Sequence, residues 1–136
     1  MRERGPERAG HVGAGVFGMD AAQMGDYTCI VWVETYGTSG TPSTQVSWQI
    51  RHKTNDTIVG RGRIRDSAGF VKEPRVVAFN GQFRIFAIGQ GGFARIGYLF
   101  IDPAATQNVA ESLTLLPGSV GNDTDWFDVA LSPTSY

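Results

Sequence analysis

Basic side chains gather in one part of the chain and offer its most distinct chemistry. Arg51 and Lys53 end one apolar stretch, and Arg61, Arg63 and Arg65 occupy alternate positions of the next. Alternate residues of a strand share a face, so these cations could together bind a polyanion or an acidic protein surface. They could instead protect an exposed outer strand against edge-to-edge pairing. No aromatic residues are interleaved with them to stack on bases, which favours the second interpretation.

Aromatic residues form the second group with a potential role in recognition. Tyr36 lies beside a Gly- and Ser-rich stretch, where an exposed ring could contact a ligand. Trp32, Trp48 and Trp126 could stack on sugars, but each lies within an expected strand, so core packing is their expected role. The candidate ligand-binding residues are therefore Tyr36, Arg51, Lys53, Arg61, Arg63 and Arg65.

No two carboxylates stand out in the sequence as a catalytic pair. Glu34, Asp66, Glu73 and Asp102 each lie at the end of an expected strand. A glycosidase needs two carboxylates about 5 to 10 Å apart in a cleft, and nothing in the spacing singles out two of these four. No Ser, His and Asp arrangement indicates a catalytic triad either. The sequence predicts no catalytic residue.

No metal site or cofactor is expected. Asn122, Asp123, Asp125 and Asp128 supply the oxygen ligands that calcium prefers, but their spacing fits no calcium loop and favours a solvated loop. The single cysteine, Cys29, excludes an internal disulfide and a cysteine-based zinc site.

The elements that carry these residues are expected to be short strands. The 136 residues include 18 glycines and 6 prolines and are 41% hydrophobic, which suits one domain of strands and tight turns. The stretch 73–102 contains three apolar runs, the first two separated by Asn80-Gly81. Asn-Gly is typical of a two-residue type I′ turn, which would place Val76 opposite Ile85. The sequence predicts an all-β fold.

Register can be predicted for a second hairpin, formed by residues 44–53 and 57–66. A three-residue loop would set Trp48 opposite Ile64 and keep apolar side chains on one face. A two-residue loop would set Trp48 opposite Arg63 and mix the faces. Consistency of the faces favours the three-residue loop.

The sequence of the C-terminal third is compatible with two secondary structures. Asp102-Pro103 could begin a helix, with Asp as N-cap and Pro at the first helical position. The alternative is a turn at Asp102-Pro103 followed by a strand at 111–116, which the repeat described next favours. Further strands are expected at 16–20 and 26–35.

The order of the expected strands repeats. A short strand and three longer ones occur at about 16–66 and again at 74–116, and a first strand follows at 126–131. Units of about 40–50 residues with four strands each are typical of propeller blades. The chain therefore resembles part of a β-propeller, although it carries no Trp-Asp, kelch or Asp-box signature. A single β-sandwich is the alternative.

The resemblance also implies how the domain is organised. Residues 1–15 would form a flexible tail and 16–136 one β domain. Because each blade buries its faces only against its neighbours, two blades cannot close a ring. The implied partners are copies of the same chain or the rest of a longer chain.

Binding is the function that this resemblance implies. In propellers, the loops joining second to third strands, and one blade to the next, emerge on one face. Here these loops would be 36–43, 66–73, 89–92 and 117–125, whose polar residues suit a glycan or a protein surface. We expect a non-enzymatic structural or binding module, similar to propeller segments of phage tail, virion or bacterial surface proteins. The alternatives are a glycosidase-like propeller enzyme and a basic-face adaptor for a polyanion.

The net charge and the hydropathy of the chain limit the classes of partner that it is expected to bind. Twelve basic and thirteen acidic residues give a net charge of −1, which does not favour nucleic acid or an anionic membrane. No apolar run approaches the roughly 20 residues of a membrane helix. The N-terminus lacks the apolar stretch of a secretion signal, so a soluble protein is expected.

Overall fold

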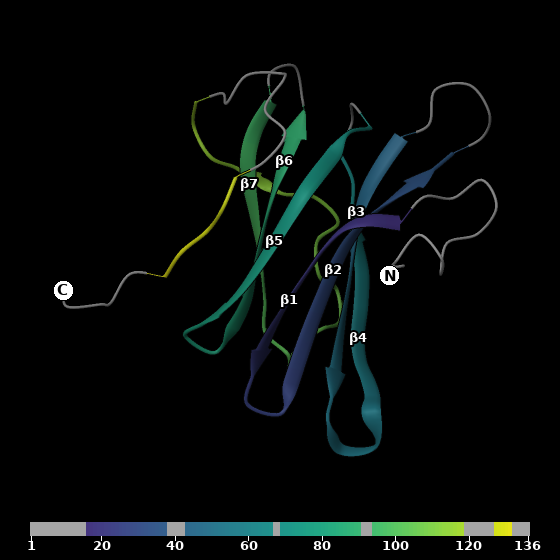
Figure 1. Cartoon of the computed structure of the whole chain (residues 1–136), viewed down its shortest axis with the longest axis vertical. Coiled ribbons are helices and arrows are strands. Elements are labelled where there is room, and N and C mark those ends of the chain that lie inside the picture. Colours follow the sequence, from purple (N-terminus) through teal and green to yellow (C-terminus); the bar gives the residue numbers. More distant parts are fainter. Residues whose placement is uncertain (1–15, 38–42, 67–68, 91–93, 119–126, 132–136) are drawn as a thin grey trace, which may run out of the picture.

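Figure 1 shows the computed structural model of the chain, which describes residues 16–37, 43–66, 69–90, 94–118 and 127–131. Within these ranges the chain forms two four-stranded antiparallel sheets. The predicted all-β fold class is confirmed. The predicted tail, 1–15, lies outside the described residues. No helix in the described part of the chain is long and apolar enough to cross a membrane.

The first sheet is an up-and-down meander. Its strands are hydrogen-bonded in chain order: β1 (Val16–Met24), β2 (Tyr27–Tyr36), β3 (Ser43–His52) and β4 (Thr57–Ile64). Residues of β2 and β3 are mostly β-branched, aromatic or polar in alternation, a composition that suits a pleated, half-buried surface. Gly25 takes a φ of +59° in the turn between β1 and β2, a conformation that glycine adopts without steric cost.

The second sheet repeats this order. It consists of β5 (Val71–Phe79), β6 (Gln82–Gln90), β7 (Ala94–Ile101) and the short β8 (Thr114–Leu115). Asn80 and Gly81 join β5 to β6 with φ values of +54° and +78°, as a type I′ turn requires. Val76 lies opposite Ile85, so the predicted register of this hairpin is confirmed.

Residues 102–116 follow the turn-and-strand alternative. The backbone carbonyl of Asp102 accepts a hydrogen bond from Ala105 at 2.9 Å, and no helix follows this turn. Of the predicted strand at 111–116, only Thr114 and Leu115 form a strand.

The predicted register of the β3–β4 hairpin is wrong by two residues. Trp48 lies opposite Gly62 rather than Ile64. The turn is longer than expected, because Asn55 and Asp56 both take positive φ values, and a bulge follows Ile50 in the pairing. Gly62 also leaves space for the indole, since a Cβ built there would lie 2.7 Å from the ring. The shift is two residues for Val46 to Ile50, so these residues keep their predicted faces. The bulge then places Ile58 opposite Arg51 on the outer face, where Ile58 is 42% exposed.

The core lies between the two sheets. Inward-facing residues of both sheets form one buried cluster, which includes Val31, Trp48, Ile50, Phe83 and Ile85. Burial of such side chains is worth about 1.5 to 3 kcal/mol each. Trp48 is 2% exposed, which confirms the core role predicted for it.

Two side chains tie the sheets together. The Asp20 carboxylate of β1 accepts a hydrogen bond from the Val76 amide of β5 at 3.0 Å. The Thr44 hydroxyl of β3 donates to the Val71 carbonyl at 2.9 Å. β5 therefore runs across the first sheet and next to β1 (Figure 1).

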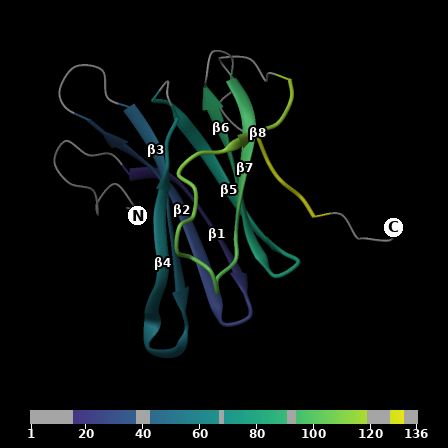
Figure 2. The ribbon, with the colours of Figure 1, turned by 180° about the vertical axis from the view of Figure 1, so that it is seen from behind.

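The connection from β7 to β8 crosses from the second sheet to the edge of β4 (Figure 2). The Thr106 hydroxyl donates to the Val59 carbonyl at 2.8 Å, and the Arg65 amide donates to the Glu111 carbonyl at 2.8 Å. Leu113 packs against the core cluster. This crossing brings Glu111 next to the first sheet.

The blade-like units predicted at 16–66 and 74–116 correspond to the two sheets, and this arrangement suits propeller blades or a sandwich equally. The strand predicted at 126–131 differs. Residues 127–131 are outside any strand and lead away from β7 in Figure 1, with the centre of the Phe127 ring 5.9 Å from the Arg75 guanidinium of β5. Trp126 lies outside the described residues.

Candidate functional site

The outer face of the first sheet carries its polar side chains in rows. Trp32 of β2 lies opposite Ser47 of β3, and Ser47 lies opposite Arg63 of β4. Gln49 and Arg61 form the neighbouring row, because residues two positions apart share a face. The smallest side chain of the group, Ser47, is in the middle.

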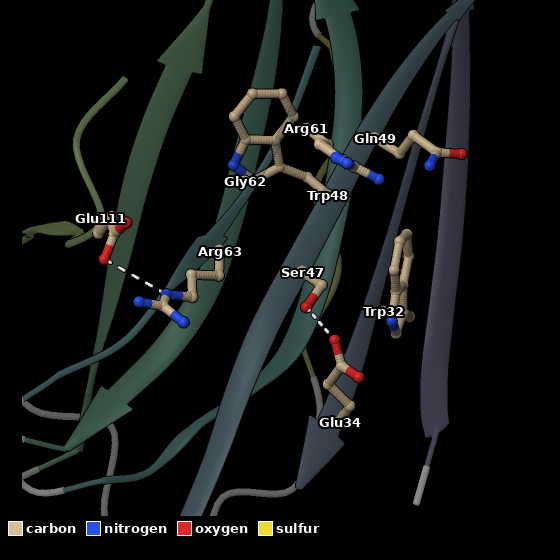
Figure 3. Close-up of a pocket in the computed structure, with 9 residues that line it drawn as sticks. All are labelled: Trp32, Glu34, Ser47, Trp48, Gln49, Arg61, Gly62, Arg63 and Glu111. Atoms are coloured by element: carbon tan, nitrogen blue, oxygen red, sulfur yellow. Dashed lines mark hydrogen bonds and ion pairs between the residues drawn. The ribbon is translucent and has the colours of Figure 1, made fainter. Parts of the chain in front are cut away.

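A pocket of about 360 Å³ opens above this serine (Figure 3). Ser47 is 5% exposed and forms its floor, while larger side chains rise around it. The volume is within the range of small-ligand sites. We call it the Ser47 pocket, and its lining residues are Trp32, Glu34, Ser47, Trp48, Gln49, Arg61, Gly62, Arg63 and Glu111.

One end of the Ser47 pocket is held by a hydrogen-bond network around Glu34. Oε1 of Glu34 accepts hydrogen bonds from the Ser47 hydroxyl and, at 3.3 Å, from Nε2 of Gln45. Oε1 of Gln45 in turn accepts from Nε of Arg65 at 2.7 Å, and the Arg65 guanidinium lies 3.8 Å from the centre of the Tyr36 ring. These contacts fix the Glu34 carboxylate in place.

The other end presents donors. Oε1 of Gln49 accepts a hydrogen bond from Nε of Arg51 at 2.9 Å, so the amide nitrogen of Gln49 remains to donate. Arg61 is exposed and forms no ion pair with the described residues. Arg63 differs, because its Nε lies 3.4 Å from Oε1 of Glu111.

A buried donor lies next to this end. Nε1 of Trp48 has no acceptor among the described residues, and the indole edge lies against Gly62, between Arg61 and Arg63 in sequence. Buried polar groups are normally paired, so this N–H is an exception.

The six predicted binding residues separate into three groups. Arg61 and Arg63 line the Ser47 pocket, and Tyr36 with Arg65 supports it through Gln45. Arg51 and Lys53 lie at the far end of the hairpin, where Arg51 pairs with Asp56 at 3.0 Å and Lys53 with Asp26 at 3.2 Å. The cations of this face are largely balanced by carboxylates.

Several lining residues were not singled out from the sequence. Alternation along 44–53 places Ser47 and Gln49 on one polar face, and Trp32 shares its face with Glu34, so part of the site could have been found from this pattern. Glu111 could not, because it reaches the pocket only through the crossing of the β7–β8 connection.

The other candidate carboxylates lie outside the Ser47 pocket. Asp66 accepts a hydrogen bond from the Phe70 amide at 3.0 Å, and Glu73 pairs with Arg75 at 3.6 Å. Asp102 accepts a hydrogen bond from the Ala104 amide at 2.9 Å. Each of these contacts shapes the backbone or pairs a neighbouring charge.

A metal centre is not found in the part of the chain that the structure describes, because no three His, Cys, Asp or Glu residues converge there. Of the acidic residues considered and rejected as calcium ligands, Asp128 accepts a hydrogen bond from the Val129 amide at 2.8 Å. Asn122, Asp123 and Asp125 lie outside the described residues, as do 38–42, 67–68, 91–92 and 119–125 of the predicted loop face.

No family model, no curated protein and no solved structure matches this chain. The class of protein is therefore defined by the fold alone, as an all-β protein of two antiparallel sheets.

Proposed function

We propose that this chain is a non-enzymatic binding module that recognises a glycan through the Ser47 pocket. The observation that carries this proposal is the Trp32 ring beside a small polar floor, with acceptors and donors at opposite ends. Sugars present apolar C–H faces that contact an aromatic ring and hydroxyls that need hydrogen-bond partners, so sites of this composition suit them.

Charge balance supports a glycan over a polyanion. The Ser47 pocket contains two arginines and two glutamates, and Arg63 is already paired with Glu111. Arg51 and Lys53, which a polyanion would also need, each pair with a carboxylate. Affinity for a polyanion depends on the number of phosphates or sulfates that free cations neutralise. This face offers few free cations.

A glycosidase is the second candidate, because Glu34 and Glu111 line the same pocket. Such an enzyme needs one carboxyl group that gives a proton to the leaving oxygen. Glu34 accepts two hydrogen bonds and Glu111 pairs with Arg63, so both groups act as acceptors. This arrangement supports binding without turnover.

The setting follows from the propeller resemblance. A glycan-binding module with blade-like sheets would suit a phage tail, virion or bacterial surface protein, in which several copies or a longer chain present many pockets at once. Weak single-site binding would then be strengthened by multivalency.

Glycan-array binding tests the proposal. We expect Trp32→Ala to weaken binding of the best glycan about tenfold or more, equivalent to about 1.4 kcal/mol of binding energy. Phe70→Ala is the matched control, because Phe70 is an aromatic residue that is 39% exposed and lies outside the Ser47 pocket. The proposal fails if no glycan binds, or if Trp32→Ala binds as tightly as the parent.

Hydrolysis of chromogenic glycosides separates the two candidates. We expect no turnover of any glycoside that the parent protein binds. Turnover that disappears in Glu34→Gln, while that variant still binds the glycan, would establish the enzyme in place of the binding module.

A further inference from the structure

The Ser47 pocket is polarised, and its polarity indicates which sugars it can take. Glu34 provides acceptors at one end, while Gln49 and Arg61 provide donors at the other. Trp32 and Ser47 lie between the two ends, opposite one another across β2 and β3. This inference rests on the proposed glycan-binding function.

Arg61 differs from the other arginines of the same face. Arg51 and Arg63 have carboxylate partners at 3.0 and 3.4 Å, and Arg65 is stacked on Tyr36. Arg61 has neither kind of partner among the described residues. Among the described residues, the Arg61 guanidinium is therefore the cation of the pocket that has no carboxylate or aromatic partner.

A neighbour adds a hydrogen-bond donor at this end. The amide oxygen of Gln49 accepts a hydrogen bond from Arg51, so the amide nitrogen of Gln49 is the group available to a ligand.

A neutral sugar would provide suitable partners for only one end of the Ser47 pocket. Its hydroxyls could bond to Glu34, but nothing in it would compensate the charge of Arg61. A carboxylate would, because it matches the planar guanidinium with two parallel hydrogen bonds. A pocket of about 360 Å³, in which Arg61 is the one cation without a partner among the described residues, suits one acidic sugar better than a densely sulfated chain.

We propose that the Ser47 pocket selects an acidic sugar, with its carboxylate on Arg61 and Gln49 and its hydroxyls on Glu34. The ring would then lie against Trp32. No atoms are transferred in this interaction, which is binding alone.

Calorimetric titration with a uronic-acid oligosaccharide, its methyl ester and the corresponding neutral oligosaccharide tests this assignment. We expect the acid to bind at least about tenfold more tightly than its ester, since hydrogen bonds between charged groups are among the stronger ones. Arg61→Gln should remove this preference, because the acid and its ester would then face the same uncharged amide. Arg61→Lys should keep only part of it, because it retains the charge but not the planar fork.

Arg95→Gln is the matched control, since Arg95 is exposed on β7 of the other sheet. It should leave all three affinities as they are. Thermal unfolding of each variant verifies that it is folded, which the exposure of Arg61 leads us to expect.

The outcomes separate this inference from the proposed function. Equal affinity for the acid and its ester, or a preference that survives in Arg61→Gln, would overturn the acidic-sugar assignment and leave the glycan-binding module standing. Absence of binding to every oligosaccharide would overturn both.

Discussion

Cys29 shows how burial changes the chemistry of a single residue. Its side chain is fully buried on the inner face of β2, and burial, followed by the negative charge of Asp20, raises the pKa of the thiol from 9.0 to about 12. The thiolate is the reactive form of cysteine, so this residue is expected to be inert in the folded protein.

The raised pKa of Cys29 makes stability depend on pH in one direction. The folded protein keeps the thiol proton up to about pH 12, whereas the unfolded chain loses it near pH 9.0. The unfolded state therefore binds fewer protons between these values, and the free energy of unfolding falls as pH rises through this window. Below pH 9 the contribution is complete and constant.

Urea unfolding at several pH values checks this prediction. We expect the parent to lose more stability between pH 9 and pH 11 than Cys29→Ala does, although the variant starts from a lower value because of its cavity. Parallel loss in the two proteins would contradict the prediction.

At the residue scale, the sequence located part of the Ser47 pocket, and Trp32, which was expected in the core, is half-buried on the outer face of β2. Arg61 and Arg63 were identified because cations at alternate positions share a strand face. Trp32 was assigned to the core by the same reasoning that correctly placed Trp48. Trp48 shares its face of β3 with the buried residues of that strand, whereas Trp32 is on the face of β2 that the buried residues do not use. This alternation separates an outer residue from an inner one.

At the scale of elements, the glycines of β4 leave room for side chains of neighbouring segments. Gly62 lies under the Trp48 indole and Gly60 under Thr106, where a Cβ would lie 2.5 Å from the threonine side chain. Glycine in a strand often marks such a close approach. The β3–β4 register was mispredicted for this reason, since counting the turn and matching faces could not show that a tryptophan needs a glycine opposite.

Gly62→Ala is expected to lower the free energy of unfolding by about 1 to 3 kcal/mol, the usual cost of overpacking a core. The new methyl group would overlap the buried indole of Trp48, which is enclosed on its other sides. Arg61→Ala on the same strand is the control, and we expect its stability to stay close to that of the parent. Chemical denaturation measures both, and equal stability of all three proteins would show that Trp48 can move aside freely.

Strand order was the most predictable property at this scale. Alternating side chains and the Asn-Gly turn predicted both meanders, because each depends on neighbouring residues only. The long connection from β7 to β8 was predicted poorly. Its path depends on Thr106 and Glu111 reaching the edge of β4, contacts between residues about 47 positions apart that no local pattern encodes.

For the molecule as a whole, the outer faces of the two sheets differ. The first carries the polar Ser47 pocket, whereas the second carries the aromatic side chains Phe86, Tyr98 and Phe100. The Arg84 guanidinium lies 4.4 Å from the centre of the Phe100 ring. In a propeller, such a face would be covered by the next blade.

The propeller resemblance therefore predicts association. Light scattering coupled to size-exclusion chromatography should give a discrete small oligomer, and Phe100→Glu should shift it toward the monomer of 14.7 kDa, because a charge would be buried in an aromatic interface. Arg95→Glu, on the same strand, is a control for the added charge alone. A stable parent monomer would favour a sandwich that is complete with two sheets.

The crossing formed by residues 102–113 also limits which insertions and deletions this sequence can accept during evolution. That segment forms no regular structure, and loops without regular structure usually tolerate insertions and deletions. Here an inserted residue would move Glu111 and Leu113 out of place together, and so disturb the pocket rim and the core at once. The turn at Asn55 contributes no described residue to the Ser47 pocket or to the core cluster. Among descendants of a common ancestor, length should therefore vary at Asn55 and remain fixed between Asp102 and Leu113.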